Sequence, residues 1–424
     1  MVGNVLLRII HTLDALGAAW HRDLFLRHGR KPVADNWRGF IPHGRREGPS
    51  LVLQAVIVRP AAIVRCVLVT LLDMANAFGS THFEAMRRAV AERPQSGFFT
   101  NWRESATIVL AGCDGKITMR PNRGGLMGER NEPDFFGEVF AGPIGRWSTH
   151  TRLHMDEGKA LWSTSPIDGR TVDLSMCGYA DDVENAFVLD KEKVAERGAA
   201  AVSAEIQKES NQVLSAELQE TGHTQSLPKQ VAIPVFAGVG NVHETKIALK
   251  DSTLEGRAAL NARYLGPQIH YKALTAAERP KRLKAMESGW REMGKFWFSD
   301  HVRNPWRLIK ATFISKVVNS GLNGMEAMLT DNADYTAIDK VTSKYSRALL
   351  AGAPSGRREL GGKMIFAALT NAQVLGRMRI PRSGAGATHS PPEMVAAARG
   401  LARRRTPGPH SDAGSVRGRA RADG

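Results

Sequence analysis

The stretch Gly178-Tyr179-Ala180-Asp181-Asp182-Val183 places two adjacent carboxylates between two apolar segments. Apolar residues alternate with other residues on both sides: Val172, Leu174 and Met176 precede the acids, and Val183, Phe187 and Leu189 follow them. Alternation that resumes after a short polar stretch predicts a β-hairpin with Asp181 and Asp182 at its tip. Taken alone, such a pair is also compatible with an ordinary solvated turn.

A further carboxylate, Asp73, ends the apolar run Cys66–Leu72. A short, continuous, β-rich run predicts a central strand that is buried on both faces. Carboxylates at the ends of neighbouring strands can converge on one point, where they repel one another unless a divalent cation neutralises them. Oxygen ligands with open water positions suit Mg²⁺, and two such ions form a clamp for in-line attack of a hydroxyl on phosphorus. We therefore expect a site for two Mg²⁺ ions, with Mn²⁺ as a substitute, held by Asp73, Asp181 and Asp182.

Two motifs at this spacing carry a resemblance to a known family. The segment Leu71-Leu-Asp73-Met-Ala-Asn-Ala-Phe78 is similar to the first palm motif of non-LTR retrotransposon (LINE-type) reverse transcriptases, and Tyr179-Ala-Asp-Asp182 is similar to their metal-binding hairpin. Their order and their separation of 108 residues (181 minus 73) also fit. The resemblance covers roughly residues 36 to 353. It implies an α+β fold, a right-hand polymerase with a palm sheet and a helical thumb, here with truncated fingers. The Pro-, Gly-, Ser- and Arg-rich composition after it predicts a disordered basic C-terminal tail.

The same resemblance implies roles for single residues. Asp73, Asp181 and Asp182 would be catalytic metal ligands, and Lys229 would protonate the pyrophosphate leaving group, although a plain surface lysine is an equally simple interpretation. Phe78 matches the aromatic residue beneath the incoming sugar, and core packing is its alternative. Tyr179 falls among the substrate-binding positions.

A glycine-rich segment, Asn122–Pro133, is similar to the family's second motif. Gly124 and Gly128 are retained, and glycines permit close backbone approach or a positive φ. Met127 stands where the family usually has a glutamine that touches nucleotide and template. The resemblance therefore places Gly124, Met127 and Gly128 at the substrate, and it puts activity or fidelity in doubt at Met127.

The predicted domains are partial fingers at 1–65, a palm with the metal-binding carboxylates at 66–250, a primer-grip hairpin with a helical thumb at 251–353, and a basic low-complexity tail at 354–424. The hairpin is predicted at 263–270. The earlier finger motifs and an endonuclease domain find no match, so we expect a front that is truncated or divergent.

Several helices are predicted from caps and apolar spacing. They are a helix opened by the capping box Thr81-His-Phe-Glu84, a charged helix over 191–220, a helix opened at Thr275–Glu278 with the stripe Leu283, Met286, Trp290, Met293 and Trp297, a helix from Asn304-Pro305 to about Leu329, and one over 331–350. Residues 142–169 are interpreted as a family-specific insertion.

Composition constrains the partners. The formal net charge of +16 and the pI near 10.0 favour a polyanionic partner, with nucleic acid ahead of an anionic membrane surface. Arg59, Pro60 and Arg65 interrupt the longest apolar region, so no transmembrane helix is expected. Three dispersed cysteines indicate reduced thiols in an intracellular protein of the nucleus or cytoplasm. The family implies an RNA template, a DNA primer or an RNA–DNA hybrid, and deoxynucleoside triphosphates as partners.

The leading hypothesis is an RNA-directed DNA polymerase that extends a primer 3′-hydroxyl by two-metal nucleotidyl transfer. The alternative is a catalytically degenerate, reverse-transcriptase-like nucleic-acid-binding protein, favoured by Met127 and by the missing finger motifs. An RNA-dependent RNA polymerase shares the palm but fits the sequence around Phe78 less well.

Overall fold

The computed structural model describes most of the chain between residues 46 and 383. The described ranges are 46–92, 96–112, 115–125, 132–155, 161–164, 169–250, 254–298, 306–351, 359–360, 363–364, 369–381 and 383. The chain divides into two units, Met1–Gly384 and Ala385–Gly424, and the second lies outside the described residues. The expected fingers before residue 46 and the end of the predicted tail also lie outside them, as do Met127 and Gly128.

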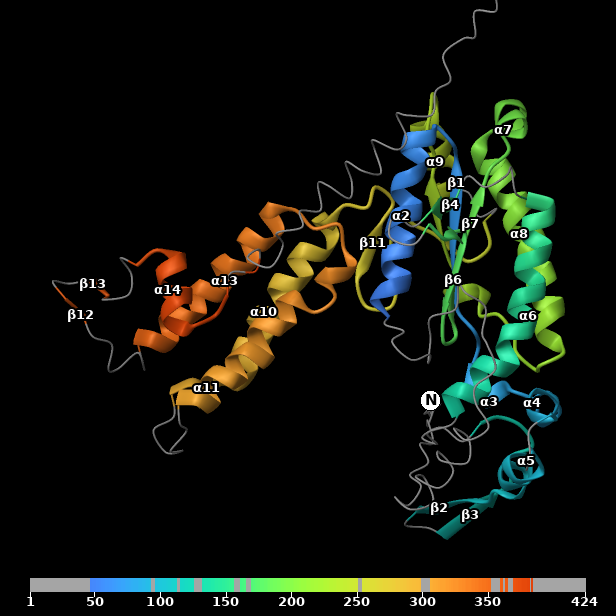
Figure 1. The fold of residues 1–424 in the computed structure, drawn as a ribbon, viewed down its shortest axis with the longest axis horizontal. Coiled ribbons are helices and arrows are strands. Elements are labelled where there is room, and N and C mark those ends of the chain that lie inside the picture. Colours follow the sequence, from blue (N-terminus) through green and yellow to red (C-terminus); the bar gives the residue numbers. More distant parts are fainter. Residues whose placement is uncertain are drawn as a thin grey trace, which may run out of the picture. The chain divides into compact units, whose positions relative to one another are not determined.

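A five-stranded sheet forms the centre of the first unit (Figure 1). Its strand order is β6 (Met176–Tyr179), β7 (Asp182–Val188), β1 (Val67–Leu72), β8 (Val231–Val235) and β9 (Arg257–Ala258). All pairs are antiparallel except β8 with β9. Every residue of β1 is buried, which confirms the prediction of a central strand covered on both faces.

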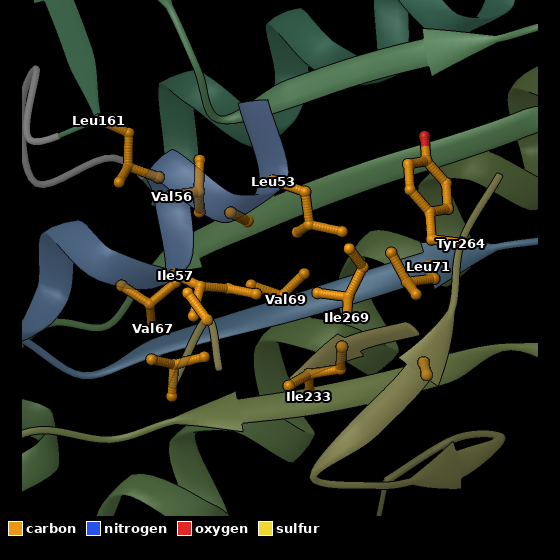
Figure 2. Packing of buried hydrophobic residues seen from close by; sticks show 14 of the residues in the cluster. Leu53, Val56, Ile57, Val67, Val69, Leu71, Leu161, Ile233, Tyr264 and Ile269 are labelled. Atoms are coloured by element: carbon orange, nitrogen blue, oxygen red, sulfur yellow. The ribbon is translucent and has the colours of Figure 1, made fainter. Parts of the chain in front are cut away.

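Helices cover the two faces of this sheet (Figure 1). Helix α2 (Glu47–Ile63) packs on one face, and α6 (Glu132–Met155) with α8 (Ala199–Gln219) packs on the other. Figure 2 shows the first contact, where Leu53, Val56 and Ile57 of α2 lie against Val67, Val69 and Leu71 of β1. Alternate side chains of β1 point to opposite faces, and so Leu72 joins the cluster beneath α6 and α8 instead.

The hairpin predicted around Asp181 and Asp182 is confirmed, but its first strand is shorter than the alternation indicated. Strand β6 begins at Met176, and Val172 belongs to another strand, β5 (Thr171–Asp173), which pairs with β4 (Trp162–Thr164). Asp173 accepts a hydrogen bond from the backbone of Ser175 at 2.8 Å. The chain therefore turns between the two strands, and alternation alone did not reveal that break.

The predicted capping box at Thr81 is wrong. Helix α4 (Phe83–Val90) begins two residues later, and its N-cap His82 makes no side-chain cap. The Thr81 hydroxyl lies instead 3.0 Å from His223 Nε2, 142 residues away. A distant tertiary partner has displaced a local capping pattern.

One other helical prediction needs correction. The charged helix at 191–220 is two helices, α7 (Lys191–Arg197) and α8, because Gly198 at a φ of 84° separates them. In the segment 142–169, which was interpreted as a family-specific insertion, α6 continues to Met155, and the interpretation as an insertion stays a prediction.

A second group of helices forms its own hydrophobic cluster. It contains α10 (Glu278–Met293), α11 (Trp306–Phe313), a π-helical turn (Ile314–Val318), α12 (Asn319–Leu322) and α13 (Asn332–Ala351). The Trp290 ring stacks on Trp297 and Tyr345, with centroids 5.0 and 4.5 Å away. The predicted stripe along α10 therefore packs into this cluster as expected. The proposed helix start at Asn304-Pro305 lies outside the described residues.

The predicted tail begins too early at residue 354. Helix α14 (Asn371–Met378) opens with a capping box between Thr370 and Gln373 and buries Leu375 and Met378 in the second cluster. Arg347 of α13 also donates to the Leu369 carbonyl at 2.7 Å. Ordered packing therefore extends to about Ile380, because apolar residues recur at helical spacing inside a basic composition.

The remaining elements are smaller. They are α3 (Ala77–Ser80), α5 (Ser96–Ser105), β2 (Ile108–Gly112), β3 (Gly115–Met119), α9 (Asn241–Lys250), β10 (Asn261–Arg263), β11 (Gln268–His270), β12 (Glu359–Leu360) and β13 (Lys363–Met364). The β10–β11 pair confirms a hairpin at 263–270. The whole is a mixed helix–sheet fold, and its division into fingers, palm and thumb stays a prediction.

Candidate active site

The register of the central strands brings the predicted site residues together. Strand β1 pairs with β7 from Val67↔Val188 to Leu72↔Val183, so the next pair along the ladder is Asp73 with Asp182. On its other side β1 pairs with β8 from Val67↔Val235 to Leu71↔Val231, and Lys229, in the 3₁₀ turn just before β8, brings its amine to the Asp73 carboxylate. Directly opposite residues have Cβ atoms about 4.5–5.5 Å apart. Asp73 is thus flanked by a carboxylate on one side and an amine on the other.

The hairpin tip supplies the other acid through a two-residue turn. Tyr179 pairs with Asp182, which leaves Ala180 and Asp181 as the central residues. Ala180 has a φ of 60° although it is not a glycine. A positive φ at the first central residue matches the right-handed twist of a hairpin and costs about 1 to 2 kcal/mol for an L-residue. The turn keeps Asp181 and Asp182 adjacent at the end of the sheet.

Electrostatics confirm that the three carboxylates lie near one another. Burial first, and then the charges of Asp181 and Asp73, together raise the pKa of Asp182 to about 7. Lys229 Nζ lies 3.0 Å from Asp73 Oδ2 in an ion pair. That oxygen is buried and has no hydrogen bond of good geometry among the described residues, so the contact is electrostatic. The group as a whole carries excess negative charge.

A neighbouring segment holds the end of β1 in place. The Asp73 carbonyl accepts from Ser226 N at 2.8 Å, and Ala75 N donates to the Thr224 carbonyl at 2.9 Å. Met74 forms an isolated bridge with Gln225 between these bonds. Lys229 follows at the end of a single 3₁₀ turn, Leu227–Lys229. The backbone therefore fixes Asp73 and Lys229 relative to each other.

The glycine-rich segment meets the same region where it is described. Gly124 N donates to the Thr81 carbonyl at 2.7 Å, and Gly125 N donates to the Phe78 carbonyl at 2.8 Å. Gly124 has a φ of 90°, and a Cβ there would lie 2.6 Å from the Gly79 carbonyl oxygen. Only glycine fits this close approach. The structure thus brings Gly124 beside Phe78, while Met127 and Gly128 lie outside the described part of the chain.

Phe78 packs on the helix behind the site. Its ring centroid lies 4.6 Å from that of Phe136 in α6, and the side chain is half-buried against the cluster beneath α6 and α8. The core-packing alternative is therefore present in the structure. A contact of the Phe78 ring with substrate stays a prediction.

Asp73, Asp181 and Asp182 have the chemistry of a divalent-cation site. Carboxylate oxygens are the ligands that Mg²⁺ prefers, and the raised pKa of Asp182 shows that this place disfavours further negative charge. Within the described ranges, however, no three His, Cys, Asp or Glu side chains meet the geometry of a metal site. The three carboxylates are chemically suitable ligands for Mg²⁺, and their arrangement around such an ion stays a prediction.

Two functional-region residues escaped the sequence analysis. Glu184 lies two residues beyond Asp182 on the same face of β7, and both of its carboxylate oxygens are buried with no hydrogen-bond partner among the described residues. Burial raises the pKa of Glu184 well above its usual range. A charged residue inside the apolar run Val183–Leu189 was the signal that could have revealed it. His223, considered below, carried no such signal.

Comparison with known proteins places the chain near one group of structures. Neither a protein-family model nor a curated protein matches the sequence. The apo telomerase of Candida tropicalis, truncated from its C-terminal domain, is 12% identical over 60% of this chain and 43% of that chain, with a TM-score of 0.38. The telomerase of Candida albicans in complex with the TWJ fragment of telomeric RNA is 8% identical over 91% of this chain and 57% of that chain, with a TM-score of 0.36.

These neighbours are reverse transcriptases of telomeres rather than of retrotransposons, and nothing in the comparisons supports a LINE-type enzyme specifically. The chain spans about half the length of the structures it matches. At TM-scores below 0.5 the likeness does not define the fold. Among the described residues, no helix is long and apolar enough to cross a membrane.

Proposed function

We propose that this protein is an RNA-directed DNA polymerase that extends a primer 3′-hydroxyl. One observation supports the proposal most: Asp73 and the Asp181–Asp182 pair reach the same end of the sheet from different strands, and Lys229 pairs with Asp73 beside them. Three carboxylates that only stabilise a fold are seldom grouped around a single lysine, because like charges in a small volume destabilise the fold. Such a group is typical of a site that handles phosphate through divalent cations.

Asp73 and Asp181 would hold two Mg²⁺ ions between them, with Asp182 in support. When bound, the ions would supply charge neutralisation at the phosphate and activation of the attacking hydroxyl. The primer oxygen forms a bond to the α-phosphorus of a deoxynucleoside triphosphate, the bond to pyrophosphate breaks, and the hydroxyl proton is lost to solvent. Lys229 is placed to donate a proton to the departing pyrophosphate, since its amine is held beside Asp73 while its side chain remains 68% exposed.

The remaining residues would position the reactants. Phe78 and Gly124 lie together at the side of the site, where a sugar and its base could rest. The β10–β11 hairpin resembles a primer grip, and Tyr179 lies at the end of the metal-binding hairpin. Holding two reactants in line supplies much of the rate enhancement in reactions of this kind. RNA template, DNA primer and hybrid duplex are accordingly the proposed partners, and a nuclear or cytoplasmic location remains a prediction.

A primer-extension assay tests this function directly. Purified full-length protein would be given a poly-ribonucleotide template, a DNA primer, deoxynucleotides and Mg²⁺. We expect extension by the wild type and none by Asp181→Asn, with template affinity and thermal stability almost unchanged because other contacts supply most of the binding energy. Asp190→Asn is the matched control, since Asp190 caps α7 away from the site and asparagine caps equally well.

A second candidate function is a nucleic-acid-binding protein with a degenerate site. The observation that favours it is the lack of ligand geometry for a metal among the described residues. Wild-type protein that binds template tightly but never extends a primer, with either Mg²⁺ or Mn²⁺, would support this candidate. Extension that survives in Asp181→Asn would remove Asp181 from the mechanism.

A further inference from the structure

A cavity of about 200 Å³ lies away from the three carboxylates, where several elements meet. The beginning of α2, the turn between β10 and β11, the first turns of α10 and the segment after α12 all contribute to its wall. The polar and charged residues that matter most are Arg46, Ser50, Arg263, Glu278, Lys281 and Arg282. None of Asp73, Asp181, Asp182 or Lys229 lines it.

Cations outnumber carboxylates in this wall by four to two. Glu47 is paired with Arg46, whose Nε lies 3.2 Å from Oε1. Glu278 is almost completely buried and is shared by Arg282 and Lys281. Arg263 is exposed, and no carboxylate among the described residues forms an ion pair with it. The cavity therefore carries an excess of two positive charges.

The cationic side chains are held in place. Glu278 Oε2 accepts from the Gln268 backbone at 2.8 Å, which fixes the β10–β11 turn against α10 while Oε1 contacts Arg282. Arg46 Nη2 donates to Asn323 Oδ1 at 3.0 Å. Gly324 has a φ of 80°, and a Cβ there would lie 3.2 Å from Arg282 Nη2, so a glycine leaves room for that guanidinium.

Ser50 is a buried polar residue of this wall. Ser50 is completely buried, and its hydroxyl makes no hydrogen bond to any described residue. Buried hydroxyls almost always have a partner. The Ser50 oxygen is itself fully buried, so it does not face a ligand, and ligand binding would depend on the charged residues.

We propose that this cavity binds a doubly charged phosphate group. Its volume is below the roughly 300–1,000 Å³ of pockets that take drug-sized ligands, so it suits one small anion or one group of a larger molecule. A phosphate monoester carries about −1.5 to −2 at pH 7, which matches the excess charge better than a carboxylate does. Planar guanidinium groups also match phosphate oxygens in pairs.

The phosphate belongs either to the end of a nucleic-acid strand or to a free small molecule. None of the three carboxylates and Lys229 lines this cavity, although Arg263 lies on the β10–β11 hairpin that is proposed above as a primer grip, so binding here is tested by variants of the carboxylates. Asp181→Asn should therefore leave phosphate binding unchanged, and a failure of one proposal is distinguishable from a failure of the other.

Two titrations of the full-length protein separate the sources. The first compares a short single-stranded RNA that carries a 5′-phosphate with the same RNA carrying a 5′-hydroxyl, by fluorescence anisotropy. The second measures inorganic phosphate by calorimetry and by its competition with the phosphorylated RNA. We expect a preference of about tenfold for the phosphorylated strand, the effect of one or two charge-assisted hydrogen bonds. Phosphate binding without a preference between the strands would identify a free phosphate as the ligand.

Variants assign the effect to the cavity. Arg263→Gln should remove most of the preference or of the phosphate binding, and Arg257→Gln, an exposed arginine on β9, is the matched control that should keep it. Equal affinity for both strands together with no phosphate binding would overturn the proposal. So would a preference that survives unchanged in folded Arg263→Gln.

Discussion

His223 makes the stability of the region behind the site depend on pH. Its side chain is buried, with Nε2 3.0 Å from the Thr81 hydroxyl and Nδ1 2.8 Å from the Thr221 hydroxyl. The rings of Phe136 and Phe140 lie edge-on to it at 5.5 and 5.4 Å. Burial among these groups lowers the pKa of His223 from 6.5 to about 4.

The shift has a defined sign and size. Above pH 6.5 the imidazole is neutral in both the folded and the unfolded chain, so the free energy of unfolding does not depend on its titration. Between pH 6.5 and about 4 the unfolded chain binds a proton that the folded chain excludes, and stability falls as the pH falls. Each unit of pKa difference corresponds to about 1.36 kcal/mol, so the loss approaches 3 kcal/mol at the lower end of the window.

Urea denaturation between pH 7.5 and 4.5 measures this loss. His223→Gln cannot titrate. It should be less stable than the wild type at pH 7.5 because it disturbs the buried hydrogen bonds of His223, and the gap in free energy of unfolding should shrink by about 2.5 kcal/mol by pH 4.5. The comparison cancels other titrating groups that both proteins share. His243→Gln, at an exposed position on α9, is the control and should follow the wild-type curve.

A constant gap would refute the reasoning. Thr81 and Thr221 hydroxyls also lie within hydrogen-bond reach of the carbonyls of Ala77 and Leu218, and in that orientation both could accept from a protonated imidazole. If those two bonds outweigh burial, the gap between wild type and His223→Gln will not change with pH. The aromatic surroundings would then have less influence on the pKa than we infer.

Three further predictions concern residues near the site. Phe78→Val should lower the free energy of unfolding by about 1 to 3 kcal/mol, because the Phe78 ring packs on Phe136. Thermal unfolding measures this loss. Increased ribonucleotide incorporation by the same variant would show that the ring also excludes the 2′-hydroxyl. Relative to the wild type, Glu184→Gln should become increasingly more stable as the pH rises above 4.5. The raised pKa of Glu184 means that the native wild-type chain retains a proton that its unfolded chain releases, so the stability of the wild type falls. Urea denaturation at pH 4 and pH 7 measures the difference. Arg103→Met should lower the free energy of unfolding by about 3 to 5 kcal/mol in denaturation experiments. The substitution removes the guanidinium that forms a buried ion pair with the Glu132 carboxylate.

The elements that sequence patterns predicted are those whose signals are local. A run of six buried residues in β1 and an acidic turn between two strands are visible without knowledge of any partner. The sequence suggests that Asp73 and Lys229 approach each other but does not give their distance. That distance depends on how two segments pair that lie 156 residues apart in the chain (229 minus 73).

The errors have a common physical cause. Thr81 satisfies the pattern of a capping box, yet its hydroxyl is bound to His223 because the fold brings that ring closer than the local backbone. Gly198 interrupts a helix that periodicity had treated as continuous. Helix α14 packs into a cluster although its surroundings are basic and rich in glycine. In each case a tertiary contact or one backbone angle outweighs a weak local preference.

The charge of the candidate site is opposite to that of the chain. Three carboxylates and one lysine give the site a formal charge of −2, whereas the protein carries +16. A strongly basic chain attracts a nucleic acid at long range, but a negative site would repel the triphosphate that is proposed as its substrate. Two divalent cations would change the local charge from −2 to +2, and so reverse that repulsion at the place where the phosphates enter. On this reasoning the acids and the basic chain serve one purpose, and the fold would require the cations for substrate binding as much as for chemistry.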